Sequence, residues 1–238
     1  MKKYLIFLSL FAVLTANMFA QIPNNNKYEQ SWKLVESKEK EDLPKSAIQE
    51  VDKILKRAIA DKNNPQIIKS LIYINKYKKA IDQNDNLGIF KDLQERISQT
   101  NDVCEKALLN SMLGELYLNF YNSNKWVYDE RTALTNAVPD DILEWSSNIF
   151  IDKTTAHLNL SVEDKAILLQ HKAAEYSDIV ELGSDSERYS PTLYDFLMLR
   201  AIDVAKVLHP NQWQSDISLN TTLTKEQLIE KAELLKKL

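Results

Sequence analysis

Glycine and cysteine are both scarce in this chain, which has three Gly and one Cys among 238 residues. A disulfide framework or an all-cysteine zinc site needs several cysteines, so a lone Cys104 excludes both. A phosphate-binding loop needs clustered glycines, where the backbone approaches the phosphate. Gly88, Gly114 and Gly183 stand far apart. A nucleotide-binding loop of this kind is therefore excluded as well.

Neither sign of charge is in large excess. The chain has 30 Lys plus Arg and 34 Asp plus Glu, which gives a formal net charge of −4. A general nucleic-acid binder carries a basic excess. We therefore expect no nucleic-acid partner, and the composition is that of an ordinary globular protein.

The amino terminus has the only pattern that indicates a cellular compartment. Residues 1–20 have a basic start, a short apolar stretch and a small residue, Ala20, at the expected cleavage point. This layout is typical of a secretory signal peptide, and the stretch is shorter than the ~20 residues of a membrane-spanning anchor, the alternative. No Cys follows the cut. We therefore predict an exported protein, periplasmic or secreted, that is not a lipoprotein and has no membrane span after cleavage.

The mature chain is expected to form one domain after a short leader. Residues 21–30 are polar and poor in large aliphatics, which predicts a flexible leader. Residues 31–238 contain no linker rich in Pro, Gly or Ser, and they are long enough to bury one core. Cys104 lies among apolar neighbours and is predicted to be buried.

Apolar residues recur at three- and four-residue steps through most of the mature chain, which predicts helices. Pro44 and Pro65 suit first turns, with Asn64 as a cap, and Thr224 opens a capping box. No strand alternation or fixed repeat is present. The fold class is therefore all-α, an irregular array or bundle of antiparallel helical hairpins, with a degenerate repeat array left open. Predicted helices cover about 44–59, 65–81, 88–98, 109–120, 139–158, a segment opened by 161–164, 191–208 and 224–238.

Residues that could support chemistry are present, but not in a diagnostic arrangement. The three histidines, His157, His171 and His209, lack the spacing of a metal site. No nucleophile motif is present. We predict no catalytic residue, metal or cofactor, and hence no enzyme.

Acidic residues cluster at 140–144 and 181–187, where helix-start acids and a solvated loop are the favoured interpretation. The alternative is a periplasmic protein that binds or cleaves glycan. It would use Glu144 or a neighbouring acid, with Trp126 and Trp145 as a platform for sugar rings. Packing or interface roles are favoured for both tryptophans.

Three groups of short motifs, in order and spacing, cover most of the mature chain. Together they resemble the amino-terminal helical region of bacterial alpha-2-macroglobulin family proteins. The motifs are WKLVE at 32–36, LPKSA at 43–47 and QIIKSL at 66–71; ELYLNFY at 115–121, NKW at 124–126 and ERT at 130–132; and DILEW at 141–145, PTLYDFL at 191–197 and RAID at 200–203.

The resemblance implies a leading segment of a longer exported protein. The family role is endopeptidase inhibition, but this chain has no Cys-Gly-Glu-Gln thioester, no macroglobulin β-sandwich repeats and no bait segment. Cys104 precedes Glu105 and Lys106, so it is not a thioester remnant. We therefore expect a non-catalytic scaffold or interaction region, either the front of a larger protein or a truncated reading frame. Its partner is expected to be the downstream portion of that chain or another protein.

Six residues from these motifs are candidates for structural or interaction roles. Among them, Arg131, Asp195 and Arg200 are predicted to form a buried polar cluster that fixes neighbouring helices, with Asp195 accepting hydrogen bonds near a helix start. The candidates are Trp126, Arg131, Trp145, Tyr194, Asp195 and Arg200.

Overall fold

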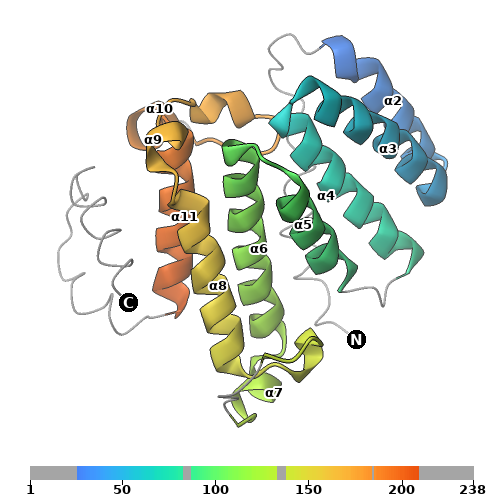
Figure 1. The fold of residues 1–238 in the computed structure, drawn as a ribbon. Coiled ribbons are helices and arrows are strands. Elements are labelled where there is room, and N and C mark those ends of the chain that lie inside the picture. Colours follow the sequence, from blue (N-terminus) through green and yellow to red (C-terminus); the bar gives the residue numbers. More distant parts are fainter. Residues whose placement is uncertain (1–25, 83–86, 133–137, 184, 209–238) are drawn as a thin grey trace. The chain divides into compact units, whose positions relative to one another are not determined.

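A computed structural model describes residues 26–82, 87–132, 138–183 and 185–208 (Figure 1). These residues form helices, with one isolated β-bridge between Lys172 and Thr192 and no strand among them. The all-α prediction is confirmed. The predicted signal peptide at 1–20 and the predicted helix at 224–238 lie outside the described residues.

The chain divides into two compact units, and the prediction of a single domain over 31–238 stays a prediction. Among the described residues, the first unit comprises those up to Ile89 together with Ala174–Gly183, and the second comprises those in the range 90–173 and in the range 185–208. The division was not predicted because no composition change marks it. The chain crosses between the units three times, because the segment Ala174–Gly183 returns to the first unit from far along the sequence.

The first unit is built on three successive helices, α2 (Asn26–Lys40), α3 (Pro44–Asp61) and α4 (Asn64–Ile81). The short turns between them pack α3 against both neighbours. The predicted flexible leader at 21–30 is wrong for residues 26–30, which belong to α2. Tyr28 is buried there, and its hydroxyl donates a 2.5 Å hydrogen bond to Asp61. Tyr28, Trp32 and Val35 form the apolar stripe that holds this helix in place.

A buried glutamine ties the returning segment to the first unit. The indole Nε1–H of Trp32 donates to Gln66 Oε1 at 2.7 Å, and Gln66 Nε2 donates to Asp178 at 2.8 Å. The α4 cap lies one residue earlier than predicted, because the side chain of Asn63, and not that of Asn64, accepts from the backbone N–H of Gln66. Pro44 begins α3 as predicted.

The second unit is organised around α6, which packs closely against α8 and also contacts α11. The three helices lie side by side, with α6 and α8 running in opposite directions (Figure 1). Short helices connect them or flank their ends. The elements are α5 (Gly88–Gln99), which begins at the unit boundary, α6 (Val103–Ser123), α7 (Lys125–Asp129), the 3-10 turn η1 (Ile142–Glu144), α8 (Ser147–Val162), α9 (Lys165–Leu168), α10 (Ser186–Tyr189) and α11 (Leu193–Leu208). The 3-10 turn η2 (Ala173–Tyr176) begins where the chain passes back into the first unit.

The backbones of α6 and α8 approach closely at Gly114. A Cβ atom at this position would lie 3.2 Å from the carbonyl oxygen of Thr154 and 3.2 Å from Cγ of Leu158. Glycine therefore permits the close approach of the two helices. Cys104, near the start of α6, is buried as predicted.

The predicted helix over 139–158 is wrong in its first third. Trp145 has an extended backbone, and α8 begins only at Ser147. Arg131 donates hydrogen bonds to the carbonyl oxygens of Leu143 and Trp145, and the indole of Trp145 donates to the carbonyl of Pro139 at 2.8 Å. These side-chain bonds satisfy the carbonyl groups of Pro139, Leu143 and Trp145. The same carbonyls would otherwise accept from backbone N–H groups within a helix, so the segment is stable without helical hydrogen bonds.

The predicted cap at 161–164 is also wrong. Ser161 is buried in the last turn of α8, and its hydroxyl donates to the carbonyl of Leu158 at 2.6 Å. The following helix, α9, spans only Lys165–Leu168. The sequence signal, a serine followed by acidic residues, is typical of a helix start. It occurs here at a helix end because the serine hydroxyl donates to a carbonyl of the preceding turn and caps no following N–H.

α11 begins two residues later than the predicted start at Pro191. The carbonyl of Pro191 accepts from the N–H of Ala173 at 3.0 Å, so this residue belongs to the turn that leads into the helix. Thr192 and Asp195 then cap each other: the Thr192 hydroxyl accepts from the Asp195 N–H at 3.2 Å, and the Asp195 carboxylate accepts from the Thr192 N–H at 3.3 Å and from its hydroxyl at 2.7 Å. The prediction that Asp195 accepts hydrogen bonds near a helix start is confirmed.

Replacing Asp195 with alanine is expected to lower the free energy of unfolding by about 1 to 3 kcal/mol, because the carboxylate is buried and caps α11. Urea denaturation followed by circular dichroism measures the change. Asp203→Ala, on the exposed side of the same helix, is the matched control and should stay within about 0.5 kcal/mol. An unchanged midpoint for the Asp195 variant would contradict the capping role.

Candidate functional site

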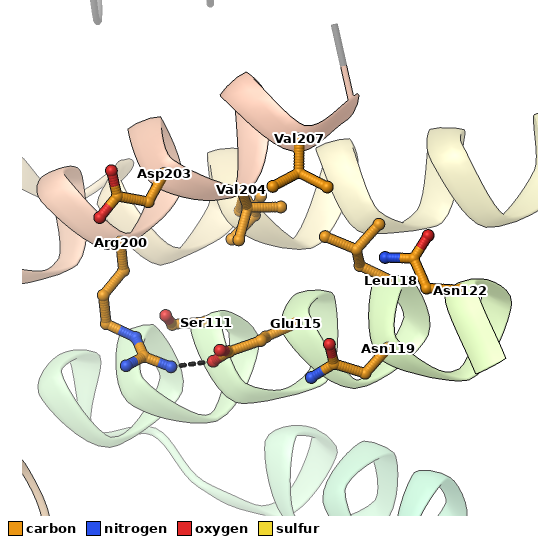
Figure 2. A pocket seen from close by; sticks show the side chains of 10 residues that line it. Ser111, Glu115, Leu118, Asn119, Asn122, Arg200, Asp203, Val204 and Val207 are labelled. Atoms are coloured by element: carbon orange, nitrogen blue, oxygen red, sulfur yellow. Dashed lines mark hydrogen bonds and ion pairs between the residues drawn. The ribbon is translucent and has the colours of Figure 1, made fainter. Parts of the chain in front are cut away.

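A groove of about 280 Å³ lies in the second unit, between α6, α8 and α11 (Figure 2). Side chains from all three helices line it, and half of them come from α6. The lining residues are Ser111, Glu115, Leu118, Asn119, Asn122, Leu158, Arg200, Asp203, Val204 and Val207.

One side of the groove is a polar row on α6. Ser111, Glu115, Asn119 and Asn122 are spaced by four, four and three residues, which places them on one helical face. At 1.5 Å per residue the row is about 16 Å long. The amide groups of Asn119 and Asn122 make no side-chain hydrogen bond to another described residue, so both can donate to and accept from a ligand.

The other side of the groove is aliphatic. Val204 and Val207 project from α11 toward Leu118 of α6 (Figure 2), and Leu158 of α8 also lines the groove. Val207 remains 57% exposed, although Leu118, Leu158 and Val204 are buried. An exposed valine beside a buried aliphatic wall provides apolar surface that a partner could cover.

An ion pair crosses one end of the groove. Arg200 reaches from α11 to the carboxylate of Glu115 on α6, as the dashed line in Figure 2 shows. Burial lowers the pKa of the Arg200 guanidinium, and Asp203 opposes this effect. The guanidinium nevertheless stays charged at any physiological pH. The pair therefore links α6 to α11 and fixes the width of the groove at that end.

Ser111 lies at the floor of the groove. Its side chain is buried, and its hydroxyl oxygen has no hydrogen-bond partner among the residues that the structure describes. A buried hydroxyl without a partner costs free energy, and no described residue offsets this cost at Ser111. The arrangement as a whole suits a ligand that combines amide-like hydrogen-bonding groups with aliphatic surface.

The two tryptophans of the predicted sugar platform do not form one surface. Trp126 in α7 is 71% exposed, whereas Trp145 is buried and packs against Tyr117 and Phe150 with ring centroids 5.3 and 5.2 Å apart. Trp145 is therefore a core residue. Glu144, next to it, points to solvent as an exposed residue of η1.

The predicted cluster of Arg131, Asp195 and Arg200 is not supported by the hydrogen bonds of the described residues. Arg131 binds the carbonyls of Leu143 and Trp145, and Asp195 caps α11. Arg200 pairs with Glu115. Spacing along the sequence did not identify these partners because two of the three arginine contacts are main-chain carbonyls. Tyr194 is buried, with the ammonium of Lys165 5.2 Å from its ring centroid.

The acidic clusters lie on the surface. The carboxylate of Asp141 caps η1 by accepting from the Leu143 N–H at 2.8 Å, and Glu181, Asp185 and Glu187 are exposed. Within the described ranges, no group of His, Cys, Asp and Glu residues is arranged to hold a metal ion.

His157 is the histidine whose environment the structure defines best. Its Nδ1 lies 2.8 Å from Oδ1 of Asn110, and its ring packs 5.6 Å from that of Tyr117. Burial is the main cause that lowers the pKa of His157 from 6.5 to about 4, and the charge of Lys153 adds to it. The ring is therefore neutral at pH 7. His209 lies outside the described residues.

Acidification should destabilise the second unit through His157. The unfolded chain takes up this proton near pH 6.5 and the folded chain only near pH 4, so the stabilisation is complete above pH 6.5 and is lost as the pH falls toward 4. We expect a loss of about 1 kcal/mol, allowing for the partly exposed ring. Thermal melts of the wild type and His157→Gln from pH 7 to pH 4 measure it. Parallel pH profiles of the two proteins would contradict it.

The groove was not predicted from the sequence, although a signal was present. The helix prediction for α6 rests on its apolar stripe, Leu109, Met112, Leu113, Leu116, Tyr117 and Phe120. The polar residues at 111, 115, 119 and 122 follow the same periodicity on another face, and this second stripe was the available signal. Of the six candidates, only Arg200 lines the groove.

No family model, curated protein or solved structure matches this chain. The resemblance to the alpha-2-macroglobulin family therefore stays a prediction from the motifs quoted above. Within the described ranges, no helix combines the length and apolar character needed to span a bilayer.

Proposed function

We propose that this chain is an exported, non-catalytic interaction region, similar to the leading segment of an alpha-2-macroglobulin-like protein. In this proposal its second unit binds a polypeptide segment in the α6–α11 groove. The bound segment belongs to the remainder of the protein or to a partner.

The observation that carries the proposal is the pairing of two surfaces across one groove. Asn119 and Asn122 each offer a donor and an acceptor, the same pair of groups that a peptide unit presents. The valines of α11 face them and offer an aliphatic surface for side chains. Grooves between helices bind peptides through this combination of an apolar wall and polar contacts at the edge.

The groove favours a polypeptide over a glycan. Its lining contains no aromatic ring, whereas sugar rings stack on aromatic faces. Trp145, which the glycan alternative required, is buried in the core. No described feature therefore supports the glycan alternative.

Photo-crosslinking in native cells tests the proposal. A benzophenone amino acid placed at Val207 should capture one recurring polypeptide segment, identified by mass spectrometry, and Asn119→Ala with Asn122→Ala should reduce its yield. The matched control carries the benzophenone at Leu160, which is 47% exposed on α8 and does not line the groove. Equal and non-specific crosslinking at both positions would refute groove binding.

Fractionation of native cells tests export. Antiserum against residues 31–238 should detect the product in the envelope or the medium. A band several times heavier than 27.5 kDa is expected for the front of a longer protein. A product confined to the cytosol would contradict this part of the proposal.

A further inference from the structure

We infer that the segment bound in the groove is residues 224–238 of this same chain. The inference rests on the proposed function, since it requires that the groove binds a polypeptide, and it names the occupant.

The first argument is position. α11 ends at Leu208, and Val204 and Val207 of its last turns line the groove. The chain therefore leaves α11 beside the site. Fifteen residues, 209–223, lie between α11 and the predicted helix, and a connection of this length can extend over ~50 Å. The connection is therefore long enough for the predicted helix to dock in either orientation along the groove.

The second argument is that the predicted helix and the groove each have apolar surface that the other could cover. The sequence of 224–238 predicts a capped helix with one apolar stripe, from Leu228 to Leu238. This stripe spans about 15 Å along the helix axis. A helix of 15 residues is marginal in water unless its apolar face is buried. Val207, which is 57% exposed near the point where the chain leaves α11, offers apolar surface for such a helix to cover. The stripe residues are Leu228, Ile229, Ala232, Leu235 and Leu238.

The third argument is charge. The groove lining has two carboxylates, Glu115 and Asp203, and one guanidinium, Arg200. Residues 224–238 have four Lys and three Glu. Counted over side chains alone, the groove lining carries −1 and residues 224–238 carry +1, and this small difference in sign favours their association.

Hydrogen exchange of the full chain, read by mass spectrometry, tests the inference. Amides between residues 228 and 235 should exchange about tenfold more slowly in the wild type than in Leu235→Asp or in Val207→Asp. Lys236→Asp places a carboxylate one position off the apolar stripe, and Leu160→Asp places one outside the groove. Neither control should accelerate the exchange. The folded state of each variant is verified by its far-ultraviolet circular dichroism.

Three results would overturn the inference. Exchange of residues 228–235 at the rate of an unstructured chain in the wild type would mean that the segment does not dock. Slow exchange that persists in Val207→Asp would place it elsewhere. Slow exchange only at high chain concentration would mean that a second copy supplies it.

The photo-crosslink separates this inference from the proposed function. Capture of residues 224–238 of the same chain by the benzophenone at Val207 supports both. Capture of a different polypeptide leaves groove binding intact and refutes only the identity of the occupant.

Discussion

Replacing Glu105 with alanine is expected to lower the free energy of unfolding by about 3 to 5 kcal/mol, because it breaks a buried ion pair and leaves one charge without its partner. The Glu105 carboxylate is buried and accepts from the Arg96 guanidinium at 2.5 and 2.9 Å and from the Thr100 hydroxyl at 2.6 Å. The Arg96 side chain is itself only 13% exposed. Equilibrium urea denaturation followed by circular dichroism measures the loss.

Two comparisons isolate the cause of this loss. Glu95→Ala removes an exposed carboxylate from α5 and should change stability by less than about 0.5 kcal/mol. Replacing both members of the pair, Arg96→Met with Glu105→Met, should restore part of the lost stability because no unpaired charge remains. A Glu105→Ala variant as stable as the Glu95→Ala variant would show that the pair does not hold α5 to α6.

Local sequence signals were sufficient for the fold class and for several helices. Pro44 begins α3 as predicted, and the apolar stripe beginning at Leu109 lies inside α6. In both cases the signal comes from residues within one or two helical turns of each other. Helix propensity, a fixed proline φ and an apolar stripe act at this range, so the sequence alone determines them.

Errors occurred where long-range contacts replace local ones. Arg131 holds the carbonyls of Leu143 and Trp145, and this contact turns a predicted helical turn into extended chain. Gln66 binds both Trp32 and Asp178, and Asp178 lies 112 residues after Gln66. This contact holds a late segment of the chain in the first unit. Neither contact has a periodic signature, because each depends on two elements that meet only in the folded chain.

The groove, too, could be predicted from the sequence only in part. The polar row on α6 has helical spacing and could have been found from the sequence. Its opposite wall could not, because α11 lies more than 70 residues later and only packing brings Val207 near Leu118. The Glu115–Arg200 pair likewise joins residues 85 positions apart. A site between helices distant in sequence requires the tertiary structure for its assignment.

The stability of the second unit should also depend strongly on Phe150. This residue of α8 is fully buried, and its ring lies 4.7 Å from that of Tyr128, 5.2 Å from that of Trp145 and 5.8 Å from that of Tyr121. It therefore connects α8 to α6, to α7 and to the extended segment before α8. Phe150→Ala is expected to cost about 3 to 5 kcal/mol, since truncation removes buried apolar surface and leaves a cavity that rigid neighbouring rings cannot fill.

Urea denaturation followed by near-ultraviolet circular dichroism measures this effect, because Trp145 reports on the packing of the cluster. Phe150→Leu keeps most of the volume and should cost less than the alanine variant. Trp126→Ala removes a larger ring that is exposed, and it should stay within about 0.5 kcal/mol. Equal losses for the Phe150→Ala and Trp126→Ala variants would mean that the aromatic cluster does not stabilise this unit. A large loss confined to Phe150 would identify the aromatic cluster as a main source of the stability of this unit, because only the buried ring joins α8 to α6, to α7 and to the extended segment before α8.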